Sequence, residues 1–244
     1  ELAALRQRCP GAPAAVKRLA IRAAVDVTQI EKMRAVVPST SMFASSPPTL
    51  NQAQQHALWQ IETRLASAES TPVLLYGVTG SGKTEVYMRA IATALRQGKT
   101  ALVLVPEIAL TDQLVERFVA RFASQIAVLH SGLSAGERFD EWRRLASGEA
   151  RIAIGARSAV FAPLDNLGLI VVDEEHDTSY KQEETPRYHA RDVAIVRAQQ
   201  CRAVVVLGSA TPALETFHNA RSGKYLALSL PQRVEDKPLP SITV

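Results

Sequence analysis

The chain has little cysteine and little aromatic content. Its 244 residues include two cysteines, Cys9 and Cys201, which lie far apart and match no disulfide framework or metal-binding motif. This scarcity indicates a reducing, cytoplasmic setting. Long apolar runs are also lacking: none approaches the roughly 20 residues of a membrane-spanning helix, and the N-terminus has no signal-peptide pattern. We therefore expect a cytoplasmic protein without a membrane partner.

Neither sign of charge dominates the composition. Lys and Arg total 28 against 24 for Asp and Glu, and the basic residues are spread along the chain. Such a balance permits nucleic-acid binding but does not by itself indicate it. The length suits one good-sized domain with a small appendage. Because the chain begins with Glu, we expect it to be a piece of a longer protein.

The sequence changes character near residue 49. Residues 1–37 group Ala, Leu and Arg as helices do, and residues 38–48 form a Pro- and Ser-rich stretch that we interpret as a linker. From residue 49 onward, short apolar runs alternate with amphipathic helical stretches. The runs are Val73–Tyr76, Ala101–Val105, Ile126–Leu129, Arg151–Ile154, Leu169–Val172 and Ala203–Leu207. Their continuous hydrophobicity predicts an α/β fold: a mostly parallel sheet with helices on both faces.

Particular residues mark where the predicted helices begin and end. Gly98 and Gly148 each follow an amphipathic stretch, in the position where glycine commonly ends a helix. Ser134 has a glutamate three residues later, which is the spacing of a capping box. Thr211 precedes a proline, and we expect its hydroxyl to cap a helix that begins there.

A glycine-rich loop follows the first predicted strand. It has the pattern G-x-x-x-x-G-K-T, and its glycines allow backbone N–H groups to point inward at an anion. Its position between a buried strand and an amphipathic helix predicts a phosphate loop rather than an incidental surface turn. Lys83 would reach the β- and γ-phosphates of a nucleotide, and Thr84 would supply a hydroxyl to Mg²⁺. The residues expected to contact the nucleotide here are Gly77, Thr79, Gly80, Ser81, Gly82, Lys83 and Thr84.

An acidic cluster follows the predicted strand Leu169–Val172. A phosphate-loop site needs a carboxylate at the end of another strand to hold Mg²⁺, and a base for the attacking water. Asp173 is the candidate metal ligand and Glu174 the candidate base. A solvated acidic loop is the ordinary alternative. His176 is either a structural or surface histidine or a residue that couples this cluster to another part of the site.

Several motifs together resemble the superfamily 2 helicases and, within them, the primosomal replication-restart helicases. The general motifs are "GSGKT" at 80–84, "DEEH" at 173–176 and "GSATP" at 208–212. The finer matches are "LNQAQ" at 50–54, "PEIALT" at 106–111, "LHSGLS" at 129–134, "GARSAVFAPL" at 155–164 and "DEEHDTSYKQEETPRYHARDVAIVRA" at 173–198. The resemblance covers about residues 49 to 234 and implies the RecA-like lobe of a P-loop NTPase. Residues 1–37 resemble part of the family's winged-helix region, but only distantly.

The resemblance implies roles for further residues. Gln54 matches a glutamine that reads adenine, although Ala53 stands where the family usually has Glu. Ser209 and Thr211 match the motif that couples hydrolysis to domain movement, and His176, beside the acidic cluster, is a further candidate for coupling. The residues that match DNA-contacting motifs are Glu107, Arg157 and Ser158, together with Tyr180, Lys181, Arg187 and Tyr188 of an aromatic-rich loop. An aromatic beside a cation can stack on bases of any sequence while contacting phosphate.

The implied activity is ATP-driven 3′→5′ translocation on single-stranded DNA during replication restart and primosome assembly. Forked DNA, primosome proteins and a single-stranded-DNA-binding protein are the implied partners, with ATP and Mg²⁺ as cofactors. The second motor lobe and its arginine are missing, so we expect weak hydrolysis from this lobe alone. Zinc is expected only in a missing C-terminal part, and residues 235–244 would begin the connection to the second lobe.

Two other functions remain open from the sequence. The chain could belong to another superfamily 2 DNA translocase, although the stretch after the acidic cluster argues against this. It could also be a non-catalytic DNA-binding module that retains the fold. The intact Lys83, Thr84, Asp173 and Glu174 argue against loss of catalysis.

Overall fold

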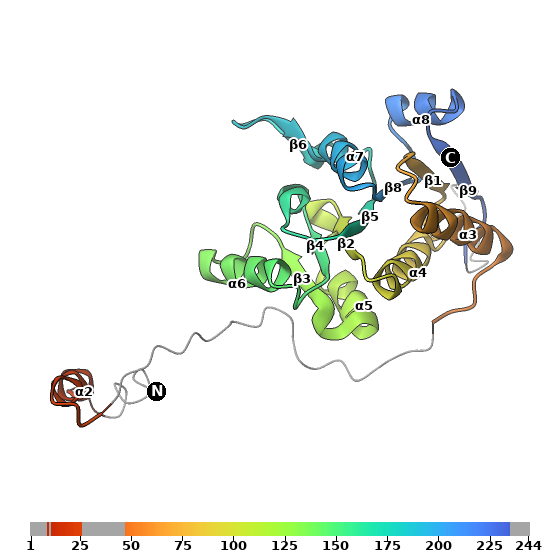
Figure 1. Ribbon diagram of the computed structural model, residues 1–244. Coiled ribbons are helices and arrows are strands. Elements are labelled where there is room, and N and C mark those ends of the chain that lie inside the picture. The colour runs from red at the N-terminus through yellow and green to blue at the C-terminus, as the bar shows by residue number, and fades with distance from the viewer. Residues whose placement is uncertain (1–8, 10, 26–46, 235–244) are drawn as a thin grey trace, which may run out of the picture. The chain divides into compact units, whose positions relative to one another are not determined.

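The computed structural model describes residue 9 and residues 11–25 and 47–234 (Figure 1). The chain divides into two compact units, Glu1–Met33 and Arg34–Val244. In the first, helix α2 (Ala12–Ile21) has a proline in its first turn and buries none of its residues. It confirms helix in part of the N-terminal segment. Most of the predicted linker, and the predicted connection at 235–244, lie outside the described residues.

The described part of the second unit contains a seven-stranded sheet in the order β3-β4-β2-β5-β8-β1-β9, and every neighbouring pair is parallel. Its strands are β1 (Val73–Gly77), β2 (Thr100–Leu104), β3 (Ile126–Leu129), β4 (Ile152–Gly155), β5 (Leu167–Val172), β8 (Val204–Ser209) and β9 (Leu226–Leu230). The six predicted strands are confirmed to within two residues at either end. Strand β9 was not predicted, because this edge strand alternates exposed and buried residues and forms no continuous apolar run.

Helices cover both faces of the sheet, as predicted. They are α3 (Gln52–Ser67), α4 (Lys83–Arg96), α5 (Asp112–Phe122), α6 (Ala135–Ala146), α7 (Ala190–Cys201) and α8 (Leu214–Arg221). Helices α3, α4 and α5 pack on one face, in a core that includes Val103 and Val171. Helices α6 and α7 contribute to a second core, which takes Leu102 and Val172 from the same strands. Residues adjacent in a strand thus enter opposite cores, which is why the six predicted strands are almost continuously apolar.

The predicted helix boundaries are confirmed in three of four cases. Gly98 and Gly148 have positive φ angles of 74° and 75° at the ends of α4 and α6. Ser134 forms the expected capping box at the start of α6. The prediction for Thr211 is wrong: α8 begins at Leu214, two residues beyond the proline. The carboxylate of the buried Glu175 accepts hydrogen bonds at the start of that helix.

Smaller elements follow the carboxyl ends of the strands. Short 3₁₀ turns η1 (Glu107–Ala109), η3 (Arg157–Phe161) and η4 (Thr178–Tyr180) follow β2, β4 and β5, and η2 (Ala123–Gln125) follows α5. An antiparallel hairpin, β6 (Lys181–Gln182) and β7 (Tyr188–His189), comes after η4. Among the described residues, no helix is both long and apolar enough to cross a membrane.

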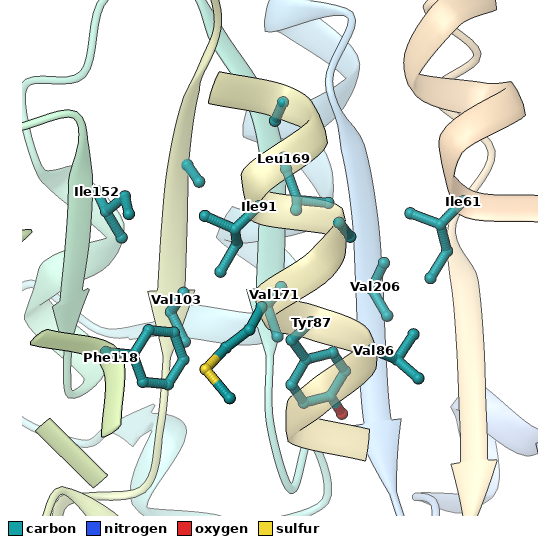
Figure 2. Close-up of a cluster of buried hydrophobic side chains, with 14 of the residues drawn as sticks. Ile61, Val86, Tyr87, Ile91, Val103, Phe118, Ile152, Leu169, Val171 and Val206 are labelled. Atoms are coloured by element: carbon teal, nitrogen blue, oxygen red, sulfur yellow. The ribbon is translucent and has the colours of Figure 1, made fainter. Parts of the chain in front are cut away.

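Ile91 tests the packing of α4 on the sheet. Its side chain is fully buried between α4 and the strands, near Leu169 and Val171 (Figure 2). Ile91→Ala should lower the free energy of unfolding by about 2–5 kcal/mol, because it removes buried methyl groups and leaves a cavity. Val196→Ala on the exposed face of α7 is the control and should change stability by less than about 0.5 kcal/mol. Urea denaturation measures both, and equal effects would contradict this packing.

Candidate functional site

The phosphate loop connects β1 to α4 and depends on its glycines. Gly80 and Gly82 both have φ near +81°, a conformation that other residues rarely adopt. A Cβ on Gly77 would lie 2.6 Å from the Ser81 Oγ and 2.9 Å from the Leu230 Cβ. The glycine pattern read from the sequence is therefore a steric requirement of this loop.

Lys83 begins α4 and is held inside the loop. Its side chain is largely buried, with the residue 7% exposed. The Nζ donates a hydrogen bond of 2.9 Å to the Gly77 carbonyl and lies 3.8 Å from the Glu174 Oε1. The phosphate loop and the acidic cluster are thus brought together around one ammonium group.

A cavity of about 720 Å³ opens between these two motifs. Cavities of roughly 300–1,000 Å³ accommodate small organic ligands. Here the polar wall offers the amides of a glycine loop, a helix N-terminus, an ammonium and two carboxylates, which is the donor set that a magnesium–nucleotide requires. Residues 79–84, Asp173 and Glu174 line this wall; the rest of the lining is Pro48, Glu85, Met88, Arg117, Ala120, Arg121, Arg233 and Val234.

Asp173 is fixed at the end of β5 from several directions. Its backbone N–H donates to the Leu104 carbonyl at 2.9 Å, and its own carbonyl accepts a 2.6 Å bond from the Tyr180 hydroxyl. Its Oδ1 accepts a 3.1 Å bond from the Tyr87 hydroxyl. Burial, and after it the nearby charge of Glu174, raise the pKa of Asp173 to about 6.

Burial, and after it the charge of Asp173, raise the pKa of Tyr87 well above its usual value, so this phenol keeps its proton and acts as a donor. Glu174 turns away from the strand direction with φ of +44°, which is unusual for a residue with a side chain. This turn accompanies the approach of its carboxylate to Lys83.

The three residues predicted to couple hydrolysis to domain movement lie close together: His176, Ser209 and Thr211. The His176 Nδ1 lies 2.8 Å from the Ser209 Oγ, and its Nε2 lies 3.4 Å from the Thr211 Oγ1. The same Nδ1 is 3.7 Å from the Glu174 Oε2. The histidine thus joins the end of β8 to the candidate base, which favours a coupling residue over an isolated surface histidine. The coupling role itself stays a prediction.

Glu175 was not singled out from the sequence, yet it organises this region. It is 0% exposed, and its carboxylate accepts bonds from the Arg191 guanidinium at 3.1 Å, the Ala213 N–H at 2.7 Å and the Thr216 hydroxyl at 2.9 Å. Two of these bonds reach the start of α8, at its N-cap residue Ala213 and at the Thr216 side chain, so the helix begins beyond Thr211. The only signal in the sequence was a third acid directly after a buried strand.

Gln54 is placed differently from its predicted role. It forms a capping box with Asn51 at the start of α3, and its Nε2 donates a 2.9 Å bond to the Ser81 carbonyl. The residue is buried and is not among those that line the cavity. Its side-chain oxygen accepts a bond from the Asn51 N–H and its side-chain nitrogen donates to the phosphate loop, so both polar atoms of the amide already have partners. This position does not support reading of adenine by Gln54.

The predicted DNA-contacting residues lie at the carboxyl ends of β2, β4 and β5. Glu107 bonds to the Ser131 hydroxyl. Arg157 donates to the Lys181 carbonyl at 2.8 Å and so holds the start of the hairpin. The Tyr188 ring packs edge-on against Phe161, with 5.1 Å between centroids. Exposed residues of the set are Glu107, Ser158, Lys181 and Arg187.

The prediction that Tyr180 contacts DNA is wrong for this structure. Its side chain is 0% exposed and belongs to the second core, so its ring has no face free to stack on a base. Its hydroxyl bonds to the Asp173 carbonyl instead. Sequence reasoning took it for a loop residue because its neighbours are polar.

Glu175→Ala tests the buried hub. The substitution leaves the largely buried Arg191 with only the exposed Asp192 as an ion-pair partner and the Ala213 N–H without its acceptor, so the free energy of unfolding should fall by about 3–5 kcal/mol. Glu183→Ala, which removes an exposed carboxylate from the hairpin, is the matched control and should have little effect. Chemical denaturation reports both; a small effect at Glu175 would contradict the network.

Comparison with known proteins places these motifs in a family. The sequence model of the DEAD/DEAH box helicases matches residues 51–220. Replication restart protein PriA of Bacillus subtilis (strain 168) is 53% identical over 204 residues, which is 83% of this chain and 25% of that protein. The PriA protein of Synechocystis sp. is 46% identical over 248 residues, which is 100% of this chain and 29% of that protein. The chain therefore spans less than a third of the length of these relatives.

Solved structures confirm the fold. RecG bound to a three-way DNA junction matches with a TM-score of 0.58 and 24% identity, over 78% of this chain and 25% of that one. The Pyrococcus furiosus Hef helicase domain matches with a TM-score of 0.50 and 21% identity, over 70% of this chain and 37% of that one. The match to the family model and the identity to the PriA proteins show that the chain belongs to the DEAD/DEAH box helicase family and corresponds to the first motor lobe of the PriA replication restart proteins.

Proposed function

We propose that this chain binds and hydrolyses ATP as the first motor lobe of a DNA helicase that acts in replication restart. The observation that carries the proposal is the convergence of Lys83, Asp173 and Glu174 on one cavity, in a chain 53% identical to a PriA protein. The phosphate loop, the first residues of α4 and the two carboxylates all line the same cavity.

Each residue has a defined task in this proposal. The loop amides and Lys83 bind the β- and γ-phosphates, and the Thr84 hydroxyl with the Asp173 carboxylate would hold Mg²⁺. The bound ion supplies neutralisation of phosphate charge. Glu174 orients the attacking water and accepts its proton. The hydrogen bond from Lys83 to the Gly77 carbonyl keeps the ammonium at the phosphate position.

DNA would run along the carboxyl ends of the strands. The exposed cations Lys181 and Arg187 and the half-buried Tyr188 form a hairpin suited to phosphate contact and stacking on single-stranded DNA. Ser209, Thr211 and His176 link that side of the lobe to Glu174. Movement in the 3′→5′ direction, action on forked DNA, and partnership with primosome proteins and a single-stranded-DNA-binding protein follow from the resemblance.

Efficient turnover needs a second lobe in this proposal. Among the described residues, three arginines line the cavity: Arg117 and Arg121 of α5, and Arg233 after β9. Arg121 is paired with Glu85 at 3.0 Å. By the resemblance, the arginine that stabilises transition-state charge belongs to the second lobe, so the lobe alone should hydrolyse ATP slowly.

Lys83→Ala tests nucleotide binding directly. Loss of the ammonium removes charge-assisted hydrogen bonds worth about 1.5–3 kcal/mol, so affinity for a fluorescent ADP should fall by about tenfold or more. Lys224→Ala, an exposed lysine after α8, is the matched control. Titration in the presence of Mg²⁺ measures both. Unchanged affinity in the Lys83 variant would sink the proposed nucleotide site and favour a non-catalytic module.

Arg187→Ala tests the DNA surface. The variant should bind a labelled oligothymidylate more weakly, and the slope of log affinity against log salt should shrink by about 0.7 for each lost phosphate contact. Arg221→Ala, at the exposed end of α8, removes the same charge elsewhere and should leave the slope unchanged. Fluorescence anisotropy at several salt concentrations gives both values. Equal slopes for all three proteins would remove the hairpin from the DNA path.

A further inference from the structure

Tyr87 lies one helical turn after Lys83 and points toward the acidic cluster. The residue is 2% exposed, and its ring belongs to the core between α4 and the sheet (Figure 2). Only its hydroxyl reaches a polar group, the Oδ1 of Asp173, at 3.1 Å. A phenylalanine would fill the same apolar space, so packing alone gives no reason for a hydroxyl here.

Gly208 provides the space for this hydroxyl. It lies in β8, next to both β5 and β1, and pairs with Leu75 of β1. A Cβ at this position would overlap the Tyr87 hydroxyl, would lie 2.8 Å from the Tyr87 Cζ, and would be 3.3 Å from the Asp173 Oδ1. Gly208 has an ordinary strand conformation, so the requirement for glycine comes from the tyrosine and not from the backbone. The glycine, the phenol and the carboxylate thus form one contact.

The contact sets the orientation of a side chain that otherwise rotates easily. The terminal torsion of aspartate is broad and roughly two-fold. Tyr180 fixes the backbone carbonyl of Asp173, and Tyr87 fixes one carboxylate oxygen. The Tyr87 hydroxyl thus engages the Oδ1 of a residue that also lines the cavity. Groups that orient a metal ligand typically change metal affinity or activity by about 10–100-fold when they are removed.

We propose that Tyr87 is a positioning residue that holds Asp173 ready for Mg²⁺, and that Gly208 is glycine because this hydroxyl occupies the space of its side chain. The inference rests on the proposed function of Asp173 as the metal ligand. It adds a direct link between the phosphate-loop helix and the acidic cluster that bypasses the nucleotide.

Tyr87→Phe separates positioning from packing. ADP affinity is measured with Mg²⁺ and again with EDTA, and the ratio gives the gain due to the metal. In the variant, that gain should be about tenfold smaller, which is the low end of the range for residues that orient a metal ligand. Its affinity in EDTA should stay within about twofold of wild type. Tyr225→Phe, which removes the same atom outside the cavity lining, should keep the full gain. Thermal unfolding verifies that both variants are folded.

Two results would overturn the proposal in different ways. If Tyr87→Phe retains the full gain from Mg²⁺, the hydroxyl is not a positioning group, whereas the proposed nucleotide site stands. If the wild-type chain binds ADP equally well with Mg²⁺ and with EDTA, the proposed metal site fails and the role of Tyr87 fails with it.

Gly208→Ala supplies an independent variant, because it displaces the hydroxyl without removing it. It should show the same reduction in the Mg²⁺-dependent gain in ADP affinity as Tyr87→Phe. The double variant Tyr87→Phe/Gly208→Ala should have a gain no smaller than that of the poorer single variant. Non-additivity of this kind is expected when two substitutions break one shared contact. Losses that multiply in the double variant would show that the two residues act separately, and would contradict the steric part of the proposal.

Discussion

The site depends on the parallel pairing of β1, β8 and β5. These strands are neighbours in the sheet, so the residues that follow their carboxyl ends lie along one edge. The phosphate loop follows β1, the Ser209–Thr211 turn follows β8, and the acidic cluster follows β5. The register pairs Tyr76 with Ser209 and Val172 with Leu207, so the three strands end within a few residues of one another. A polar site can form at this edge because the strands leading to it are buried on both faces.

The three consecutive acids of the cluster have different partners. Asp173 takes a hydrogen bond from Tyr87, Glu174 turns toward Lys83, and Glu175 turns inward to Arg191. Glu175 shows the physical rule most clearly, since a fully buried carboxylate is tolerated only when its oxygens are paired. Its bonds to Ala213 and Thr216 tie β5 to the helix after β8. The third acid is thus the structural member of the cluster and connects the end of β5 to the start of α8.

Sequence patterns predicted the parts that depend on local rules. Continuous apolar runs gave six of the strands, and the glycine spacing gave a loop whose conformation needs those glycines. What sequence reasoning missed depends on long-range contacts. Tyr180 lies in a polar stretch of sequence, but its ring packs in the second core and its hydroxyl bonds to the carbonyl of Asp173. Gln54 braces the loop because the fold brings Ser81 to it. Neither partner could be identified from spacing along the chain.

The burial of Tyr180 changes how the hairpin relates to the site. Its neighbour Lys181 begins the hairpin, and Arg157 binds the carbonyl of Lys181. Tyr180 itself holds the backbone of the predicted metal ligand, Asp173. Under the proposed function, a strand of DNA that shifts the hairpin would therefore pull on Asp173 through a single side chain. Tyr87 restrains the carboxylate of the same residue from the opposite side, on the helix that carries Lys83. Asp173 thus lies between two tyrosines, one attached to the phosphate loop and the other to the hairpin, and its position depends on both.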